Sequence, residues 1–379
     1  MTRFPRPALA VVKVGSSSLR GPDGLLDRDQ VHRLAEQIVT VRESGTRVVL
    51  VSSGAVAAGM GLLGLDRRPA DLQTLQACAA VGQGELIHEY QRTFRTHGLS
   101  AAQILLTPDD FGQRRRYLNA RHTLQRLLAL EAVPVINEND AVATDELAYG
   151  DNDHLAALVA SMLDAQLLLL LSDVEGLYDG HPANEGSQLV ERVEHAGELD
   201  LAAVGGTGSH VGSGGMRTKV EASLIATAST VHAVVADARR PGVIHDAMAG
   251  ASVGTWFVAE TRRLEARRLW IGYALRPTGR LHVDGGAAQA LVERGRSLLA
   301  VGVTDVEGSF QPGDAVEVVG PDGRVVARGL ATYGDEDVRR LAGRSTLDAV
   351  EDLGPHYARE VVHRDDLAVR VPSREGSWR

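Results

Sequence analysis

The sequence predicts a layered α/β protein in which an open, mostly parallel sheet is followed by a small β-rich domain. Up to about residue 260, short apolar runs alternate with longer helical patterns, and several of the runs lack polar alternation. Such runs are typical of strands that are covered on both faces in a parallel sheet. After residues 261–280, which we interpret as a helical or basic link, the chain changes to short β-like runs separated by turns. The strand–helix–strand order of the first part implies right-handed crossovers.

The elements follow in order along the chain. The strands predicted for the first domain are residues 8–14, 46–52, 100–106, 132–137, 165–172 and 231–237. Helical patterns occupy residues 27–44, 119–131, 154–161 and 216–228. The β-like runs of the second domain are residues 280–284, 298–308, 315–320 and 324–333.

Composition excludes several classes of protein. The formal net charge of −9 argues against a protein that coats nucleic acid or an anionic membrane. Cys78 is the only cysteine, which excludes an intrachain disulfide and a cysteine-based metal cluster. The apolar run 167–171 is far too short to span a membrane, and Lys13 interrupts the apolar run near the start, which favours a buried strand over a signal peptide. We therefore expect a cytoplasmic protein with no membrane partner.

Polar clusters follow the predicted strands. The clusters are GSSS at 15–18, SSG at 52–54, NEND at 137–140 and SD at 172–173, and a further GDND at 150–153 precedes a helix. Each cluster alone is most simply a loop or a helix cap. However, the carboxyl ends of parallel strands meet at one edge of a sheet, where ligands of such folds bind. Together the clusters predict a binding cleft.

Lysine is used at two positions only. Of the 40 basic side chains, all are arginine except Lys13 and Lys219. Lysine offers a compact ammonium on a flexible stem, whereas arginine offers a planar fork. Lys219 falls in the first turn of a predicted helix, where a cation opposes the helix dipole unless an anion is held there, and Arg217 adds a second cation. We interpret the two lysines as phosphate clamps.

The other candidate features are weaker. The glycine-rich run 205–215 fits neither GxGxxG nor GxxxxGK[ST] and could be a surface loop, although backbone amides there could wrap phosphates. No protein metal ligand is assigned, because carboxylates at turns are mostly caps and Mg²⁺ usually binds nucleotide phosphates. His154 could line the cleft or simply begin a helix. The carboxylates considered are Asp140, Asp151, Asp153 and Asp173.

Six motifs, in order, resemble the glutamate 5-kinase family. They are VVKVGSSSL (11–19), VVLVSSGAVAAG (48–59), VPVINENDAVAT (133–144), GDNDHLAAL (150–158), LLLLSDVEGLY (168–178) and GSGGMRTK (212–219), with PGVI (241–244), VGTWF (253–257) and VHRDDL (362–367) beyond them. The resemblance implies an amino-acid-kinase fold over 1–261 and a PUA domain over 277–355. It also implies ATP-dependent phosphorylation of L-glutamate to L-glutamyl 5-phosphate, the first step of proline biosynthesis.

The resemblance further implies residue roles. Lys13 and Lys219 would stabilise charge on the transferring phosphoryl group, and Asp153 would orient them. The glutamate-binding set would be Ser53, Asn137, Asp140 and Asn152. The ATP-contacting set would be Lys13, Ser172, Asp173, Ser213, Gly214, Gly215, Met216, Arg217, Thr218 and Lys219. The family often has threonine at Ser213 and serine at Arg217, which leaves the contact of Arg217 open. Mg²⁺ bound with ATP, feedback inhibition by L-proline and a homo-oligomer are also implied.

Alternatives remain. Aspartokinase and acetylglutamate kinase share the fold, but the NENDAVAT and GDND motifs favour glutamate 5-kinase. A bifunctional pyrroline-carboxylate synthase would need a reductase domain, for which we expect no room in 379 residues. A PUA domain could indicate an RNA-binding or RNA-modifying protein. Residues 277–355 hold 13 acidic and 8 basic side chains, a net charge of −5, which is the wrong sign for a phosphate-backbone binder. We therefore expect a structural or regulatory role for this domain.

Overall fold

The computed structural model describes two compact units. One lies within residues 1–263 and the other mainly covers 264–379; we refer to them as the N-terminal unit and the C-terminal unit. The N-terminal unit contains an eight-stranded sheet and the C-terminal unit a five-stranded sheet. The residues described are 4–107, 109–142, 152–181, 184, 186–196, 199, 215–261, 266–275 and 277–370.

The sheet of the N-terminal unit confirms the predicted parallel architecture. Its strands are β1 Leu9–Val14, β2 Arg47–Ser52, β3 Ala101–Leu106, β4 Val133–Glu138, β5 Leu167–Ser172, β6 Arg192–Val193, β7 His232–Asp237 and β8 Thr255–Phe257. Their order is β3-β4-β2-β1-β5-β7-β8-β6. Each neighbouring pair is parallel except β7 with β8. All six predicted strands are present, whereas β6 and β8 were not predicted.

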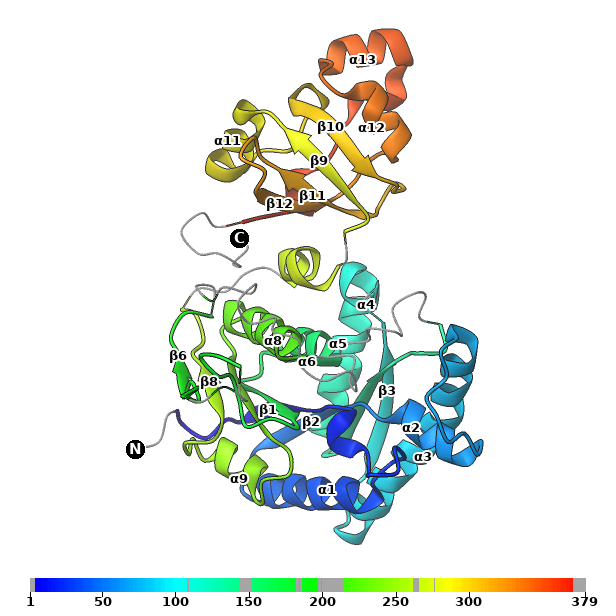
Figure 1. Cartoon of the computed structure of the whole chain (residues 1–379), viewed down its shortest axis with the longest axis vertical. Coiled ribbons are helices and arrows are strands. Elements are labelled where there is room, and N and C mark those ends of the chain that lie inside the picture. The colour runs from blue at the N-terminus through cyan, green and yellow to red at the C-terminus, as the bar shows by residue number, and fades with distance from the viewer. Residues whose placement is uncertain are drawn as a thin grey trace. The chain divides into compact units, whose positions relative to one another are not determined.

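Helices cover both faces of this sheet. Figure 1 shows α1, α3 and α9 against one face and α5, α6 and α8 against the other. The helical elements are η1 Ser17–Leu19, α1 Arg28–Glu43, α2 Ala55–Leu62, α3 Leu72–Thr96, α4 Asp109–Gly112, α5 Arg114–Ala129, α6 Asn152–Met162, α8 Met216–Ala228 and α9 Val243–Met248. The predicted start of α5 at residue 119 is wrong, because exposed arginines at 114–116 extend the helix without adding an apolar pattern.

Side-chain alternation along β1 directs Lys13 toward α6 and α8. Ala10, Val12 and Val14 belong to the core that β1 shares with α1, α3 and α9. Successive side chains of a strand point to opposite faces, so Val11 and Lys13 point to the other face. The ammonium of Lys13 therefore lies at the carboxyl edge of the sheet, on the face where α6 and α8 begin.

Helices α2 and α3 touch backbone to backbone. A Cβ atom added at Gly59 would lie 1.8 Å from the carbonyl oxygen of Cys78, and one added at Gly82 would lie 1.9 Å from the carbonyl oxygen of Ala55. Neither position has room for a side chain. The contact holds the first turn of α2 beside the end of β2.

The C-terminal unit has its own core, with Phe310, Leu281 and Val316 among its fully buried members. Its sheet order is β10-β9-β11-β12-β13. The elements are α10 Ala266–Leu269, the π-helical turn η3 Trp270–Ala274, β9 Gly279–Val283, α11 Gly285–Arg294, η4 Ala300–Gly302, β10 Val303–Gly308, β11 Ala315–Val319, β12 Val325–Leu330, α12 Asp335–Leu341, α13 Thr346–Leu353, η5 Pro355–Ala358, η6 Arg364–Asp366 and β13 Leu367–Val369.

The predicted β-rich character of this unit is confirmed. Each of the four predicted runs contains a strand, but residues 300–302 of the second run form a 3₁₀ turn rather than a strand. β13 was not predicted because three residues are too few to show a period. Across the ranges that the structure describes in both units, no helix is both long and apolar enough to cross a membrane.

Candidate active site

Three buried charges meet at the carboxyl edge of the eight-stranded sheet. Lys13 is the penultimate residue of β1, Asp153 lies in the first turn of α6, and Lys219 lies in the first turn of α8. The Nζ atom of Lys13 contacts Oδ1 of Asp153, and Nζ of Lys219 donates to Oδ2 of Asp153 at 3.2 Å. Each lysine is 4% exposed and Asp153 is fully buried. The two lysines of the chain therefore share one carboxylate.

The electrostatics of this cluster keep Asp153 ionised. Burial alone would raise the pKa of its carboxyl group, but the ammonium groups of Lys13 and Lys219 outweigh burial and hold that pKa well below its usual range. Thr218 also donates from Oγ1 to Oδ2 of Asp153 at 3.2 Å. Among the described residues, two ammonium groups face one carboxylate in this buried place. Such a place favours an anion.

A network of amides lies next to the cluster. Nδ2 of Asn152 donates to Oγ of Ser53 at 2.9 Å and to Oδ1 of Asn137 at 2.9 Å. Nδ2 of Asn137 donates in turn to Oε1 of Gln83 at 2.6 Å. These contacts connect the ends of β2 and β4 with α6 and α3. Because Asn152 directly precedes Asp153, the same helix end belongs to both the network and the charged cluster.

A pocket opens on this network. It is lined by all four residues predicted from the resemblance to bind glutamate, which are Ser53, Asn137, Asp140 and Asn152. Burial raises the pKa of the Asp140 carboxyl group to about 6, while the Arg68 guanidinium beside it acts in the opposite direction. Asp140 is therefore a carboxylate that ionises close to neutral pH.

The residues predicted to contact ATP occupy two neighbouring places. Ser172 is the last residue of β5, which pairs with β1, and Asp173 follows it; Oγ of Ser172 donates to Oδ1 of Asp173 at 3.1 Å. Gly215 precedes α8 as its N-cap, and the first turn of α8 contains Met216, Arg217, Thr218 and Lys219. Ser213 and Gly214, like Asp151, lie outside the described residues.

Arg217 and His154 both contact Glu221. Nε of Arg217 donates to Oε1 of Glu221 at 2.9 Å, and Nε2 of His154 lies 3.3 Å from Oε2. Burial acts to raise the pKa of Glu221, but His154 and Arg217 lower it overall. The charge of Arg217 is therefore balanced by Glu221. His154, for which two interpretations were open, packs between α6 and α8.

The described side chains do not form a cage for a metal ion. In the part of the chain that the structure describes, no group of three or more His, Cys, Asp or Glu side chains could hold one. The carboxylate of Asp153 is already shared by two ammonium groups.

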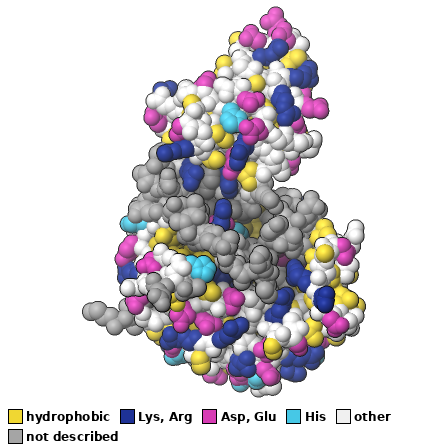
Figure 2. Space-filling view, in the orientation of Figure 1, with side chains coloured by type: hydrophobic (Ala, Val, Ile, Leu, Met, Phe, Trp, Pro, Cys, Tyr) yellow, Lys and Arg dark blue, Asp and Glu magenta, His cyan; other side chains and the backbone are white. Residues whose placement is uncertain are grey.

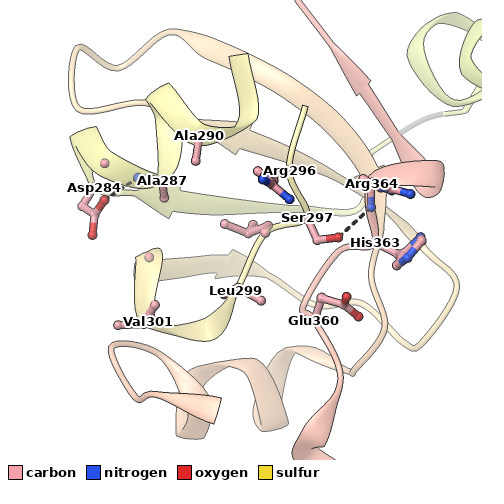
Figure 3. Close-up of a pocket in the computed structure, with 13 residues that line it drawn as sticks. Asp284, Ala287, Ala290, Arg296, Ser297, Leu299, Val301, Glu360, His363 and Arg364 are labelled. Carbon is pink, nitrogen blue, oxygen red and sulfur yellow. Dashed lines mark hydrogen bonds between the residues drawn. The ribbon is translucent and has the colours of Figure 1, made fainter. Parts of the chain in front are cut away.

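A larger pocket lies in the C-terminal unit. Its volume is about 650 Å³, and none of the predicted site residues line it. Figure 3 shows Arg296, Ser297 and Arg364 on one side and the apolar Leu299 and Val301 on another. Oγ of Ser297 accepts a hydrogen bond from the backbone N–H of Arg364 at 3.1 Å. Both arginines are exposed, so this pocket lacks the buried charges of the first site.

Comparison with known proteins assigns both units. A model of the amino acid kinase family matches residues 8–237, and a model of the PUA domain matches residues 279–351. A protein of Streptomyces coelicolor named glutamate 5-kinase is 49% identical over 363 residues, which cover 96% of each chain. This chain belongs to the glutamate 5-kinase family. The resemblance noted in the motifs and the amino-acid-kinase and PUA architecture are thereby confirmed.

A second relative of this glutamate 5-kinase family member carries the same name. A Salinispora arenicola protein of the same name is 49% identical over 360 residues, covering 95% of this chain and 97% of that protein. A solved UMP kinase from Bacillus anthracis is 14% identical, covers 68% of this chain and 98% of its own, and has a TM-score of 0.47.

Three residues of the site were not singled out from the sequence. Gln83 holds Asn137 from α3, and Arg20 and Arg68 line the pocket. Arg20 and Arg68 are two of many arginines in the sequence, and no spacing distinguishes them from the others. Gln83 is a buried polar residue on an otherwise apolar helix face, which is a pattern that could have indicated it.

Proposed function

We propose that this member of the glutamate 5-kinase family transfers the γ-phosphoryl group of ATP to the side-chain carboxylate of L-glutamate. The product is L-glutamyl 5-phosphate, and the reaction is the first step of proline biosynthesis. The observation that carries this proposal is the buried Asp153 carboxylate held between Lys13 and Lys219 next to an amide-lined pocket.

The reaction needs positioning more than proton transfer. A carboxylate is already a competent nucleophile, so no general base is required. Lys13 and Lys219 would offset the negative charge of the transferring phosphoryl group from two sides, β1 and α8. Asp153 would hold both ammonium groups in place before the substrates arrive. Such preorganised charges contribute to the rate because they need not reorganise during the reaction.

The pocket residues would bind the amino-acid end of glutamate. The ionised Asp140 suits the substrate ammonium, and the amides of Asn137 and Asn152 suit its polar groups, with Ser53 held among them. The side-chain carboxylate would then extend toward Lys13 and Lys219. Asn152 would bind the amino-acid end of glutamate, and Asp153 would hold the lysines that face its side-chain carboxylate. Because the two residues are consecutive, the two parts of the substrate site keep fixed positions relative to each other.

ATP would bind between the end of β5 and the start of α8. Ser172, Asp173 and the stretch 213–219 are the proposed contacts, with Arg217 contributing less because Glu221 balances its charge. Mg²⁺ would accompany ATP and neutralise phosphate charge when bound. We assign it to the phosphates, in keeping with the few protein ligands that Mg²⁺ requires.

The remaining properties concern regulation and assembly. L-Proline shares an ammonium and an α-carboxylate with glutamate, so we propose that it inhibits by occupying an overlapping site.

We also propose a homo-oligomer, because exposed apolar side chains, Leu62, Leu63 and Val81, occur at α2 and α3, where hydrophobic side chains gather in Figure 2. A cytoplasmic location and the domain bounds 1–261 and 277–355 complete the proposal.

The C-terminal PUA domain is proposed to modulate the kinase rather than to bind RNA. Its range 277–355 carries a net charge of −5, and non-specific affinity for RNA arises mainly from neutralised phosphates.

The activity is tested by measuring ADP release with L-glutamate, L-aspartate and N-acetylglutamate side by side. We expect turnover with glutamate to exceed turnover with the other two strongly. A preference for aspartate or N-acetylglutamate would overturn the substrate assignment. Adding L-proline at low and high glutamate tests the overlap, since inhibition that glutamate does not relieve would place proline elsewhere.

A further inference from the structure

The pocket beside the amide network has a cationic side. Its wall includes Arg20, Arg68 and the first turn of α2, residues 55–57. Ala58 is the first residue of α2 whose N–H reaches an intrahelical acceptor, the Gly54 carbonyl, at 3.0 Å. The preceding N–H groups of a helix have no partner within it and carry the positive end of the helix dipole. The wall thus combines two guanidinium groups with backbone donors.

Buried polar atoms at the pocket lack partners of their own. Oδ1 of Asn152 and Nε of Arg20 are both buried and have no hydrogen-bond partner among the residues that the structure describes. Asn152 is only 7% exposed, and it lines the pocket while its Nδ2 atom is fully engaged. A buried acceptor and a buried donor left open on the same pocket are costly unless a ligand satisfies them. The pocket therefore suits a ligand that bears both a cationic and an anionic group.

The two arginines lack a balancing ion pair. Arg20 and Arg68 repel one another, and Asp140 is the carboxylate that offsets Arg68. Neither arginine has a carboxylate within ion-pair distance among the described ranges, whereas arginines such as Arg28, Arg121 and Arg328 do. Like charges gathered at a pocket are stabilised when an anion enters, and a guanidinium fork matches a carboxylate particularly well.

We infer that Arg68 and Arg20, with the first turn of α2, bind the α-carboxylate of the amino-acid substrate and so set the length of substrate that is accepted. This inference rests on the proposed function. The side-chain carboxylate must reach Lys13 and Lys219, which do not line this pocket, so the carboxylate at the arginines is the one at the other end. Fixing that end lets the pocket discriminate by the number of methylene groups between the two carboxylates.

The test pairs one substitution with one substrate change. Arg68→Ala is compared with Arg67→Ala, because Arg67 is adjacent and exposed, as Arg68 is, but does not line the pocket. Each enzyme is assayed with L-glutamate and with L-isoglutamine, which keeps the side-chain carboxylate and replaces the α-carboxylate by a neutral carboxamide. We expect Arg68→Ala to lower kcat/KM for glutamate by about 10- to 100-fold, the range for a hydrogen bond to a charged group. With isoglutamine the loss should stay within about twofold.

The outcomes separate the two proposals. Equal losses with both substrates would mean that Arg68 acts by holding Asp140 or its own segment, and would overturn the inference. An unchanged KM for glutamate in Arg68→Ala would overturn it as well. A wild-type enzyme that does not phosphorylate glutamate would instead overturn the proposed function. Arg68→Lys, which keeps the charge without the fork, should fall between wild type and Arg68→Ala, and thermal melting checks that all variants are folded.

Discussion

The two units keep their charged residues in different places. The N-terminal unit buries Lys13, Asp153 and Lys219 at a sheet edge, whereas the C-terminal unit leaves Arg296 and Arg364 exposed around a pocket of about 650 Å³. The visible surface of each unit mixes charges of both signs (Figure 2). Volume alone would select the C-terminal pocket. Burying charge is energetically costly, so the buried and paired ions favour the N-terminal site as the proposed catalytic site more strongly than volume favours the other pocket.

Replacing either lysine should have the largest effect. We expect Lys13→Arg and Lys219→Arg each to lower kcat by about 10²–10³, because the fork of arginine cannot take the position of a compact ammonium. The extra bulk in a buried site should also cost about 1–3 kcal/mol of stability. The measurements are steady-state kinetics and thermal melting. Arg33→Lys on the exposed face of α1 is the control. A kcat near the wild-type value in either lysine variant would contradict the claim that these buried ions differ from ordinary surface charges.

The contact between α2 and α3 offers a second test of how the N-terminal unit holds its site in place. Gly82→Ala places a Cβ 1.9 Å from the carbonyl oxygen of Ala55, so we expect α2 to shift, with stability reduced by at least about 1–3 kcal/mol and a raised KM for glutamate. Gly84→Ala on the same helix meets no atom within 4 Å. That control should be neutral or stabilising by about 0.5–1 kcal/mol. Equal melting temperatures for the two variants would contradict the packing argument.

The pH dependence of glutamate use sharpens the role of Asp140. Because the pKa of Asp140 is raised to about 6, the carboxylate that would bind the substrate ammonium is present above that pH and is lost as pH falls through it. We expect kcat/KM for glutamate to fall about tenfold per pH unit below 6, the slope of a single protonation. Asp140→Asn should lower kcat/KM at pH 8 and flatten this limb, with little change in KM for ATP. If the fall in kcat/KM below pH 6 persists in Asp140→Asn, the protonation of another group causes it.

The smallest effect is expected in the C-terminal unit. Replacing Arg296 and Arg364 together by alanine should change kcat and KM by less than about twofold, since exposed charges contribute little to a buried site. The full chain, titrated with labelled RNA at increasing salt, should show weak binding that the double variant does not alter. Tight binding that weakens steeply with salt would show that this unit binds the phosphates of RNA.

The positions of the strands along the chain were largely predictable from the sequence, but the order in which the strands pair was not. Apolar runs located all six longer strands of the first sheet, because strands covered on both faces are nearly continuous in apolar residues. The order β3-β4-β2-β1-β5-β7-β8-β6 depends on contacts between distant segments and leaves no local pattern. Helices α2 and α3 are inconspicuous because each carries two glycines, which weaken helical propensity. Of these, Gly59 and Gly82 are explained by the close contact between the two helices, which the sequence does not display.

The charged part of the site was easier to foresee than its surroundings. Lys13 and Lys219 stand out in a chain that otherwise uses arginine, and Asp153 lies in a polar cluster at a helix start. Gln83 acts through a single hydrogen bond across a fold that the sequence does not display. The expectation that Arg217 adds positive charge at the start of α8 did not take account of Glu221, which lies one helical turn later and balances it.

The central place of β1 has a consequence for how the protein is made. β1 is the first of the described strands to leave the ribosome, yet it pairs with both β2 and β5. Lys219 follows later still, and at about 5–20 residues per second the interval between the two lysines lasts roughly 10–40 s. Until β5 emerges, one edge of β1, which is apolar apart from Lys13, has no partner and can pair with other chains. The strand that closes this edge, β5, is therefore synthesised before α8 supplies Lys219.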